Sequence, residues 1–232
     1  MFDVRNLSVG YGPLGVLHDI GFHVAEGEVL GIIGPNGAGK TTLLSALTGL
    51  IPARSGSIRF QDLSIFNWPS HKVVRRGIGL VAQHRELFPG MSVQENLDLG
   101  ARGLGKKPLE QRRQEIFALF PRLEERRQQL AGTLSGGERA MLATGRALMS
   151  SPRLLMLDEP TAGLSPLIVQ HLVTALAELR DAGQTMVLVE QNVSMLLKLA
   201  TKVIVLREGR IVQDRDVHAY HDKKELFSLF VE

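Results

Sequence analysis

Gly34-Pro35-Asn36-Gly37-Ala38-Gly39-Lys40-Thr41-Thr42 is the stretch that decides the fold of this chain. An apolar run with β-branched residues, Val29 to Ile33, precedes it, and the leucines after it have the spacing of an amphipathic helix. A strand, a glycine-rich loop and a helix, with G-x-x-x-x-G-K-[ST] in the loop, form a phosphate-binding loop. We therefore predict that residues 34–42, called the P-loop below, bind a nucleotide.

The residue types of the P-loop suit an anion. Glycines let backbone N–H groups turn inward around a negative charge. The helix that starts near Lys40 directs the positive end of its dipole to the same place. Lys40 adds a full charge near the β- and γ-phosphates, and the Thr41 hydroxyl is a suitable ligand for Mg²⁺. A nucleotide with Mg²⁺ is the expected ligand.

The composition is that of an ordinary globular chain. Its 232 residues, 44% hydrophobic and 22% charged, suit one large domain or a core with a substantial insertion. A formal net charge of +3 neither requires nor excludes a polyanionic partner. The chain has no cysteine, which excludes disulfides and thiolate metal sites. Because no apolar run approaches the ~20 residues that span a bilayer, a role at a membrane is expected to come through a partner.

The patterns along the chain predict an α/β fold with a P-loop NTPase (RecA-like) core, an antiparallel β flank and an inserted α-helical subdomain. The core is expected over about 1–84 and 152–215, as one domain. Phe2 to Val9 has the alternation of an edge strand within the flank. The pattern is almost entirely helical over about 85–151, which marks the insertion, and about 216–232 is predicted as a C-terminal helix.

Within the insertion, three helices are expected. Ser92 and Glu95 have the spacing of a capping box, which starts the first helix. A loop is predicted from Gly100 to Pro108, a second helix from Leu109 to Phe120, and a third that begins at Ser135.

Two acidic residues, Asp158 and Glu159, end the apolar run that begins at Leu154. The run is apolar on both faces, as expected for a central parallel strand, and its carboxyl end should lie beside the P-loop. Asp158 is then placed to hold Mg²⁺, directly or through water, and Glu159 to take a proton from an attacking water. The alternative, two acids that start a turn with Pro160, is disfavoured by the P-loop upstream.

Leu134–Glu138, Leu-Ser-Gly-Gly-Glu, is a second candidate anion site. Ser135 and Glu138 form a capping box, so a simple well-capped helix is the alternative. Gly136 and Gly137 in the first turn reduce helix stability, which makes sense where another molecule must approach the backbone closely.

Together these residues resemble the ATP-binding subunit of an ABC transporter over nearly the whole chain. The P-loop, Gln83, Leu134–Glu138 and Asp158-Glu159 occur in the order of that family. The resemblance implies ATP hydrolysis that drives membrane transport, with ATP and Mg²⁺ bound. It also implies that two subunits close head to tail, each ATP lying between one P-loop and the Leu134–Glu138 signature of the other subunit. The signature residues Ser135, Gly136 and Gly137 are then expected to bind ATP across the dimer.

The resemblance assigns further residues and partners. It implies that Tyr11 stacks on adenine, and that Gln83 reaches the metal and the attacking water. Thr41, Gln83 and Asp158 are the expected metal ligands. Transmembrane permease subunits, a second ATPase subunit of the same or another kind, and a solute-binding protein reached through the permease are the expected partners. The chain is expected as a peripheral protein on the cytoplasmic face of the inner or plasma membrane.

The chain departs from the usual family pattern at two positions. Ser165 stands where the dimer-contact loop usually has aspartate. Gln191 stands where most members have a histidine that reaches the γ-phosphate, and glutamine donates a hydrogen bond without carrying a proton. The string Val189-Glu190-Gln191-Asn192 resembles the ATPases of branched-chain amino acid importers, of the LivF kind, and of related urea and amide importers. Arg139 after Glu138 resembles instead the lipopolysaccharide-export ATPase.

Two other classes compete with a transporter. ABC-type ATPases that act on nucleic acid or ribosomes carry long coiled coils or two tandem domains, neither of which occurs here, so no nucleic-acid partner is expected. A small-molecule kinase with a P-loop leaves Leu134–Glu138 unexplained.

Overall fold

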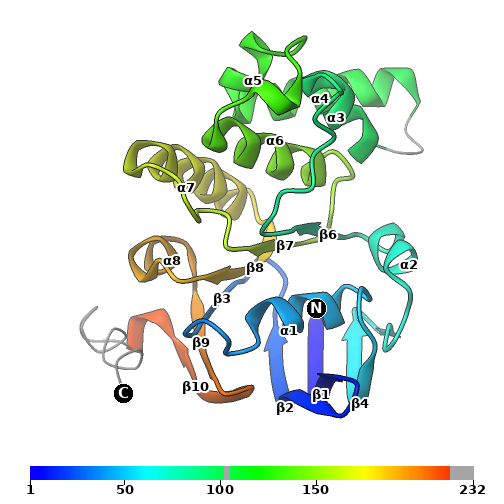
Figure 1. The fold of residues 1–232 in the computed structure, drawn as a ribbon, viewed down its shortest axis with the longest axis vertical. Coiled ribbons are helices and arrows are strands. Elements are labelled where there is room, and N and C mark those ends of the chain that lie inside the picture. Colours follow the sequence, from blue (N-terminus) through cyan, green and yellow to red (C-terminus); the bar gives the residue numbers. More distant parts are fainter. Residues whose placement is uncertain (102–104, 220–232) are drawn as a thin grey trace.

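The computed structural model describes residues 1–101 and 105–219 (Figure 1). A mainly parallel sheet crosses the middle of the molecule. Most of the helices gather at one end, and an antiparallel sheet lies at the other. The α/β class with an antiparallel flank, predicted from the sequence, is confirmed.

The larger sheet has the strand order β10-β9-β3-β8-β7-β6, and only β10 runs antiparallel to its neighbour. Its strands are β3 (Val29–Ile33), β6 (Ile78–Val81), β7 (Leu154–Asp158), β8 (Thr185–Glu190), β9 (Lys202–Arg207) and β10 (Arg210–Asp216). The P-loop follows β3, while Asp158 ends β7. Because β8 lies between these two strands, the acidic residues and the P-loop are separated by one strand at the same edge of the sheet.

The central strands β3, β7 and β8 are buried on both faces, which explains why they are mostly apolar, whereas β10 is largely exposed and charged. In β7, Leu155 and Leu157 pack in the cluster formed with the helices α3 to α8. Leu154 and Met156 face the opposite cluster, which contains α1 and the antiparallel sheet. Side chains alternate along a strand, so Asp158 points to the same side as α1, the helix that follows the P-loop.

The smaller sheet is antiparallel, with the order β2-β1-β4-β5. Its strands are β1 (Phe2–Tyr11), β2 (Leu14–Val24), β4 (Ala53–Phe60) and β5 (Leu63–Ser64). The prediction of an edge strand over Phe2 to Val9 is wrong, because β1 pairs with β2 on one side and β4 on the other. Alternating hydrophobicity reports which face of a strand is buried and carries no information on how many neighbours it has.

The helices are α1 (Lys40–Leu47), α2 (Ser70–Arg75), α3 (Val93–Gly100), α4 (Lys106–Leu119), α5 (Pro121–Glu125), α6 (Gly136–Leu148), α7 (Pro166–Asp181) and α8 (Val193–Leu199), with 3₁₀ turns at Ala131–Thr133 and Val217–Ala219. The short helices α2 and α5 were not predicted from the sequence. Helices α3 to α6 connect β6 to β7 and lie together at one end of the molecule (Figure 1). Among the described residues, no helix is both long enough and apolar enough to cross a bilayer.

Two boundaries differ from the predictions. Helix α4 begins at Lys106, so the predicted loop from Gly100 to Pro108 is too long: proline is tolerated in the first turn of a helix, where its missing N–H has no partner. Asp216 belongs to β10, and a 3₁₀ turn follows it. The charged residues of β10 lack the apolar pattern by which a strand is predicted from sequence. The remainder of the predicted C-terminal helix lies outside the described residues.

Candidate active site

The P-loop adopts a conformation that only glycine takes without strain. Gly37 and Gly39 have φ angles of 82° and 102°, in the left-handed region. A side chain on Gly34 would bring its Cβ to 2.2 Å from the carbonyl oxygen of Leu206. Helix α1 begins at Lys40, and because glycine occupies the position before it, no side chain there competes for the first N–H groups of the helix. These N–H groups are available to a phosphate.

A cavity of about 280 Å³ opens beside the P-loop. It is lined by Val16, Asn36, Gly37, Gly39, Lys40, Thr41, Thr42, Gln83 and Glu159. The other predicted P-loop residues, Gly34, Pro35 and Ala38, belong to the same loop without lining this cavity. The structure thus brings the P-loop together with Gln83 and Glu159, which are distant in sequence. Val16 was not predicted: it is a partly buried β-strand residue of the hairpin β1–β2 and carries no polar signal in the sequence.

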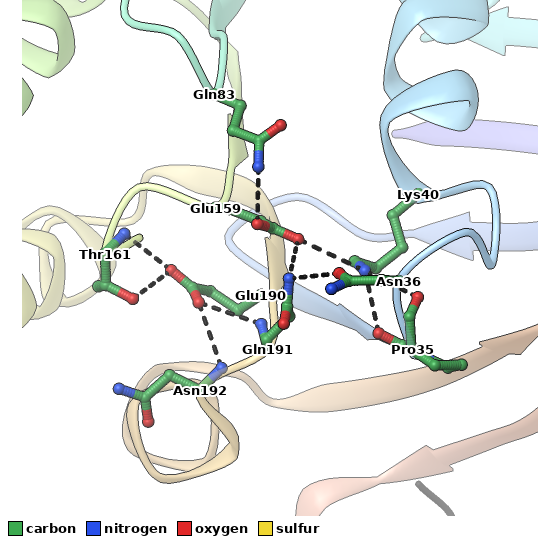
Figure 2. A network of polar contacts seen from close by, with 10 residues as sticks. Pro35, Asn36, Lys40, Gln83, Glu159, Thr161, Glu190, Gln191 and Asn192 are labelled. Carbon is green, nitrogen blue, oxygen red and sulfur yellow. Dashed lines mark hydrogen bonds and ion pairs between the residues drawn. The ribbon is translucent and has the colours of Figure 1, made fainter. Parts of the chain in front are cut away.

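Lys40 is almost completely buried, with 5% of its surface exposed. Its Nζ donates hydrogen bonds to the carbonyl oxygens of Gly34, at 2.9 Å, and Pro35, at 3.2 Å. It also lies 3.4 Å from Oε1 of Glu159 (Figure 2). Lys40 is therefore held against the backbone of the loop and beside the Glu159 carboxylate.

Glu159 is the centre of the polar network in Figure 2. Its two carboxylate oxygens accept hydrogen bonds from Nε2 of Gln83, at 2.9 Å, and from Nε2 of Gln191, at 2.7 Å. The same Nε2 of Gln191 donates to Oδ1 of Asn36 in the P-loop, at 2.9 Å. Three predicted catalytic side chains, from the ends of β6, β7 and β8, therefore meet at the P-loop.

Asp158 and Thr41 fit a magnesium ion. Burial raises the pKa of the Asp158 carboxyl, and the Thr41 hydroxyl partly offsets that rise. Oδ1 of Asp158 is buried and has no hydrogen-bond partner among the described residues, which leaves a carboxylate oxygen free for a cation. Residues 1–101 and 105–219 contain no cluster of three His, Cys, Asp or Glu side chains that could hold a metal. Mg²⁺ commonly takes one or two carboxylates and completes its coordination shell with water and phosphate.

The Leu134–Glu138 signature is placed elsewhere, at the start of α6. Ser135 accepts a hydrogen bond from the Glu138 N–H, and Glu138 accepts one from the Ser135 N–H, so the predicted capping box is present. The signature residues lie outside the set that lines the P-loop cavity in the described part of the chain. A Cβ on Gly137 would lie 2.5 Å from Ile168 of α7, which explains this glycine by helix packing. A Cβ on Gly136 would meet its first neighbour only at 3.7 Å.

Tyr11 is the last residue of β1 and is half exposed, outside the set that lines the cavity. Its stacking on adenine stays a prediction. Ser165 occupies the N-cap of α7, and Pro166 follows it at the first position of the helix, where proline is favoured.

Two polar residues that the sequence did not single out connect the functional loops. Arg85, two residues after Gln83, donates to the carbonyl oxygens of Gly136, at 2.8 Å, and Ala162, at 3.0 Å. Desolvation lowers the pKa of its guanidinium. Glu190 ends β8 and is buried next to Thr161. A charged residue at the end of an apolar strand was the available signal for Glu190, while no local pattern marks Arg85.

Comparison with known proteins agrees with this arrangement. A family described as "ABC transporter" matches residues 17–162. The chain is 45% identical, over 91% of both chains, to the high-affinity branched-chain amino acid transport ATP-binding protein BraG of Pseudomonas aeruginosa. It is 36% identical to the probable branched-chain amino acid transport ATP-binding protein LivF of Archaeoglobus fulgidus, over 91% of this chain and 90% of that one. The solved structure of a nucleotide-free ATP-binding cassette from an ABC transporter has a TM-score of 0.86 and 26% identity, and covers 98% of this chain and 94% of that chain.

The fold and the P-loop cavity together define a P-loop NTPase. Within that class, the chain belongs to the ABC transporter family, as an ATP-binding subunit that hydrolyses ATP.

Proposed function

We propose that this chain is the ATPase subunit of an importer for branched-chain or related amino acids. The names of the two relatives support this substrate class, as does the Val189–Asn192 string. In this proposal the chain lies as a peripheral protein on the cytoplasmic face of the membrane and drives transmembrane permease subunits. A solute-binding protein delivers the amino acid to the permease and determines selectivity together with it.

The observation that carries the mechanism is the meeting of Lys40, Gln83 and Gln191 on one carboxylate, that of Glu159. Lys40 and the P-loop N–H groups hold the β- and γ-phosphates of ATP. Glu159 accepts the proton of the attacking water, and the amides of Gln83 and Gln191 orient that water and the γ-phosphate. Tyr11 stacks on the adenine.

In this proposal Thr41, Asp158 and Gln83 would hold Mg²⁺, which would supply positive charge against the charge that develops on the transferred phosphoryl group. The free Oδ1 of Asp158 supports this assignment.

The signature supports a dimer as the working form. Ser135, Gly136 and Gly137 have the character of a phosphate site yet lie outside their own P-loop cavity. A second ATPase subunit, identical or related, supplies its signature to this P-loop and receives this signature in return. ATP closes the dimer and hydrolysis opens it, which rocks the permease subunits.

Transport assays test the proposal. Cells that make the chain together with the permease and binding protein of its own genome are given labelled leucine, isoleucine, valine, urea or acetamide. We expect uptake of the branched-chain amino acids, and loss of that uptake in the Glu159→Gln variant. Uptake of urea or acetamide in place of the amino acids would contradict the substrate class without affecting the assignment as a transport ATPase.

A further inference from the structure

The carboxylate of Glu190 is buried between two loops that carry reactive residues. Only 2% of this residue is exposed. Its Oε1 accepts hydrogen bonds from the backbone N–H of Thr161, at 2.9 Å, and from the Thr161 hydroxyl, at 2.7 Å. Its Oε2 accepts from the backbone N–H groups of Gln191, at 3.1 Å, and Asn192, at 3.3 Å (Figure 2). One side chain therefore joins the loop after β7 to the loop after β8.

A carboxylate suits this place better than any other side chain. Four donors converge on it, and an ionised carboxylate is an acceptor only, with room for about four hydrogen bonds. Burial alone disfavours the charge and raises the pKa of Glu190, while these hydrogen bonds lower it. Since a buried carboxylate is costly unless it is fully hydrogen-bonded, its position between these loops calls for a reason beyond the packing of β8.

The loop after β7 carries Glu159 and the loop after β8 carries Gln191, and these two side chains contact each other. Glu159 stands two residues before Thr161 and has a φ of 45°, a conformation that residues other than glycine rarely adopt. Gln191 follows Glu190 directly, and its Nε2 donates to Oε1 of Glu159 at 2.7 Å. A shift of either loop would separate these side chains, because both backbones are fixed by the same carboxylate.

We propose that Glu190 is a positioning residue for ATP hydrolysis: its carboxylate fixes the loops of Glu159 and Gln191 in the relative position in which these two side chains are hydrogen-bonded. The inference rests on the proposed roles of Glu159 and Gln191. Glu190 itself touches neither ATP nor the attacking water in this account. It acts on the rate of the chemical step and leaves the P-loop, which binds ATP, in place.

The variant Glu190→Gln tests this with little change of shape. One of the two carboxylate oxygens is replaced by an NH₂ group. This group cannot accept hydrogen bonds from the backbone N–H groups that it faces, so one of the two loops is no longer held. We expect kcat for ATP hydrolysis to fall about 10- to 100-fold, as for other small displacements of reacting groups. The affinity for a fluorescent ATP analogue should change less than about twofold, because binding and chemistry are separated.

Thr161→Val is a smaller change, because it removes one hydroxyl donor and keeps the backbone N–H. It should lower kcat by less than Glu190→Gln does. In the double variant with Glu190→Gln it should lower kcat almost no further, as for residues that act as a unit. Thr185→Val is the matched control. Thr185 is buried at the other end of β8, where its hydroxyl accepts from the Gly27 N–H at 2.9 Å.

The outcomes separate positioning from general stability. Wild-type kcat in Glu190→Gln contradicts the proposal, as does an equal loss of kcat in Thr185→Val, or a loss of ATP affinity that parallels the loss of kcat. If Glu190→Gln does not fold, Thr161→Val alone decides, by the same comparison with Thr185→Val. Glu159→Gln is measured beside them: normal turnover in that variant refutes the proposed catalytic roles, whereas its inactivity beside a normal Glu190→Gln refutes only the positioning role.

Discussion

The P-loop cavity and the signature at the start of α6 have opposite surroundings, although both have the character of anion sites. At the P-loop, side chains from three strand ends converge on one carboxylate, that of Glu159. At the signature, the capping box closes on itself through Ser135 and Glu138, and the contact from a functional loop is the guanidinium of Arg85 on a carbonyl. The first region contains the side chains proposed to cleave ATP, while the second offers N–H groups that lie outside the P-loop cavity in the described part of the chain.

This difference supports the proposal that one chain contributes a catalytic half-site and a separate binding half-site. A Cβ on Gly136 would meet Arg85 at an ordinary contact distance of 3.7 Å, whereas one on Gly137 would lie 2.5 Å from Ile168 of α7. Packing among the described residues therefore does not require glycine at position 136, and a nucleotide held by a second subunit would explain it. The predictions below address the two regions separately.

The largest effect is expected from Glu159→Gln. The amide keeps the shape of the side chain but cannot take the proton, so kcat should fall about 10²- to 10⁴-fold, the usual contribution of a general base. ATP binding remains, so gel filtration with ATP and Mg²⁺ should show a persistent dimer. Glu178→Gln, at an exposed position of α7, is the control. Normal turnover in Glu159→Gln would end the assignment of a general base.

Ser135→Arg should stop turnover by blocking the other region. The long cation fills the start of α6, where the N–H groups must meet a phosphate of the partner's ATP. The monomer should bind ATP normally in an equilibrium titration, because Ser135 lies outside its own P-loop cavity. Ser150→Arg, exposed beyond the other end of α6, should hydrolyse ATP as the wild type does. An equal loss of monomer affinity would place the signature in its own pocket.

Lys40→Ala should weaken ATP binding by about 10- to 100-fold or more, the effect of losing a charged hydrogen bond to phosphate. Because Lys40 also holds Gly34, Pro35 and Glu159, the loop loses an internal support as well. Circular dichroism should report an intact fold. Lys72→Ala, exposed on α2, serves as control. Unchanged affinity would refute the P-loop site.

Gln191→Ala should have the smallest effect, a fall in kcat toward or below about 10²-fold with little change in ATP affinity. Its amide donates to both Glu159 and Asn36, so its loss loosens one contact to the general base. Gln191→His should stay active, since imidazole also donates, and its rate should gain a dependence on pH near ~6.5 that the wild type lacks. Wild-type turnover in Gln191→Ala would reduce Gln191 to a polar residue at a strand end.

Sequence patterns marked the candidate reactive residues more easily than the residues that contact them. The P-loop, Asp158 and Glu159 are short local patterns, and chemistry requires their residue types at a fixed spacing. Glu190 and Arg85 act through long-range contacts, to Thr161 and to Gly136, which no local pattern encodes. The same limit explains β1: its alternation revealed a strand, but its second neighbour, β4, is about 50 residues away in sequence.

A mixing experiment tests the central claim, that each active site combines two chains. Lys40→Ala and Ser135→Arg are purified separately, each inactive, and then mixed in equal amounts with ATP and Mg²⁺. If the signature of one copy completes the P-loop of another, a mixed dimer has one site with both halves intact. The mixture should then regain up to about a quarter of wild-type hydrolysis, since half of randomly formed dimers are mixed and each has one intact site of two. Where the wild-type chain hydrolyses ATP as a homodimer under the same conditions, a mixture as inactive as either variant alone would contradict the account.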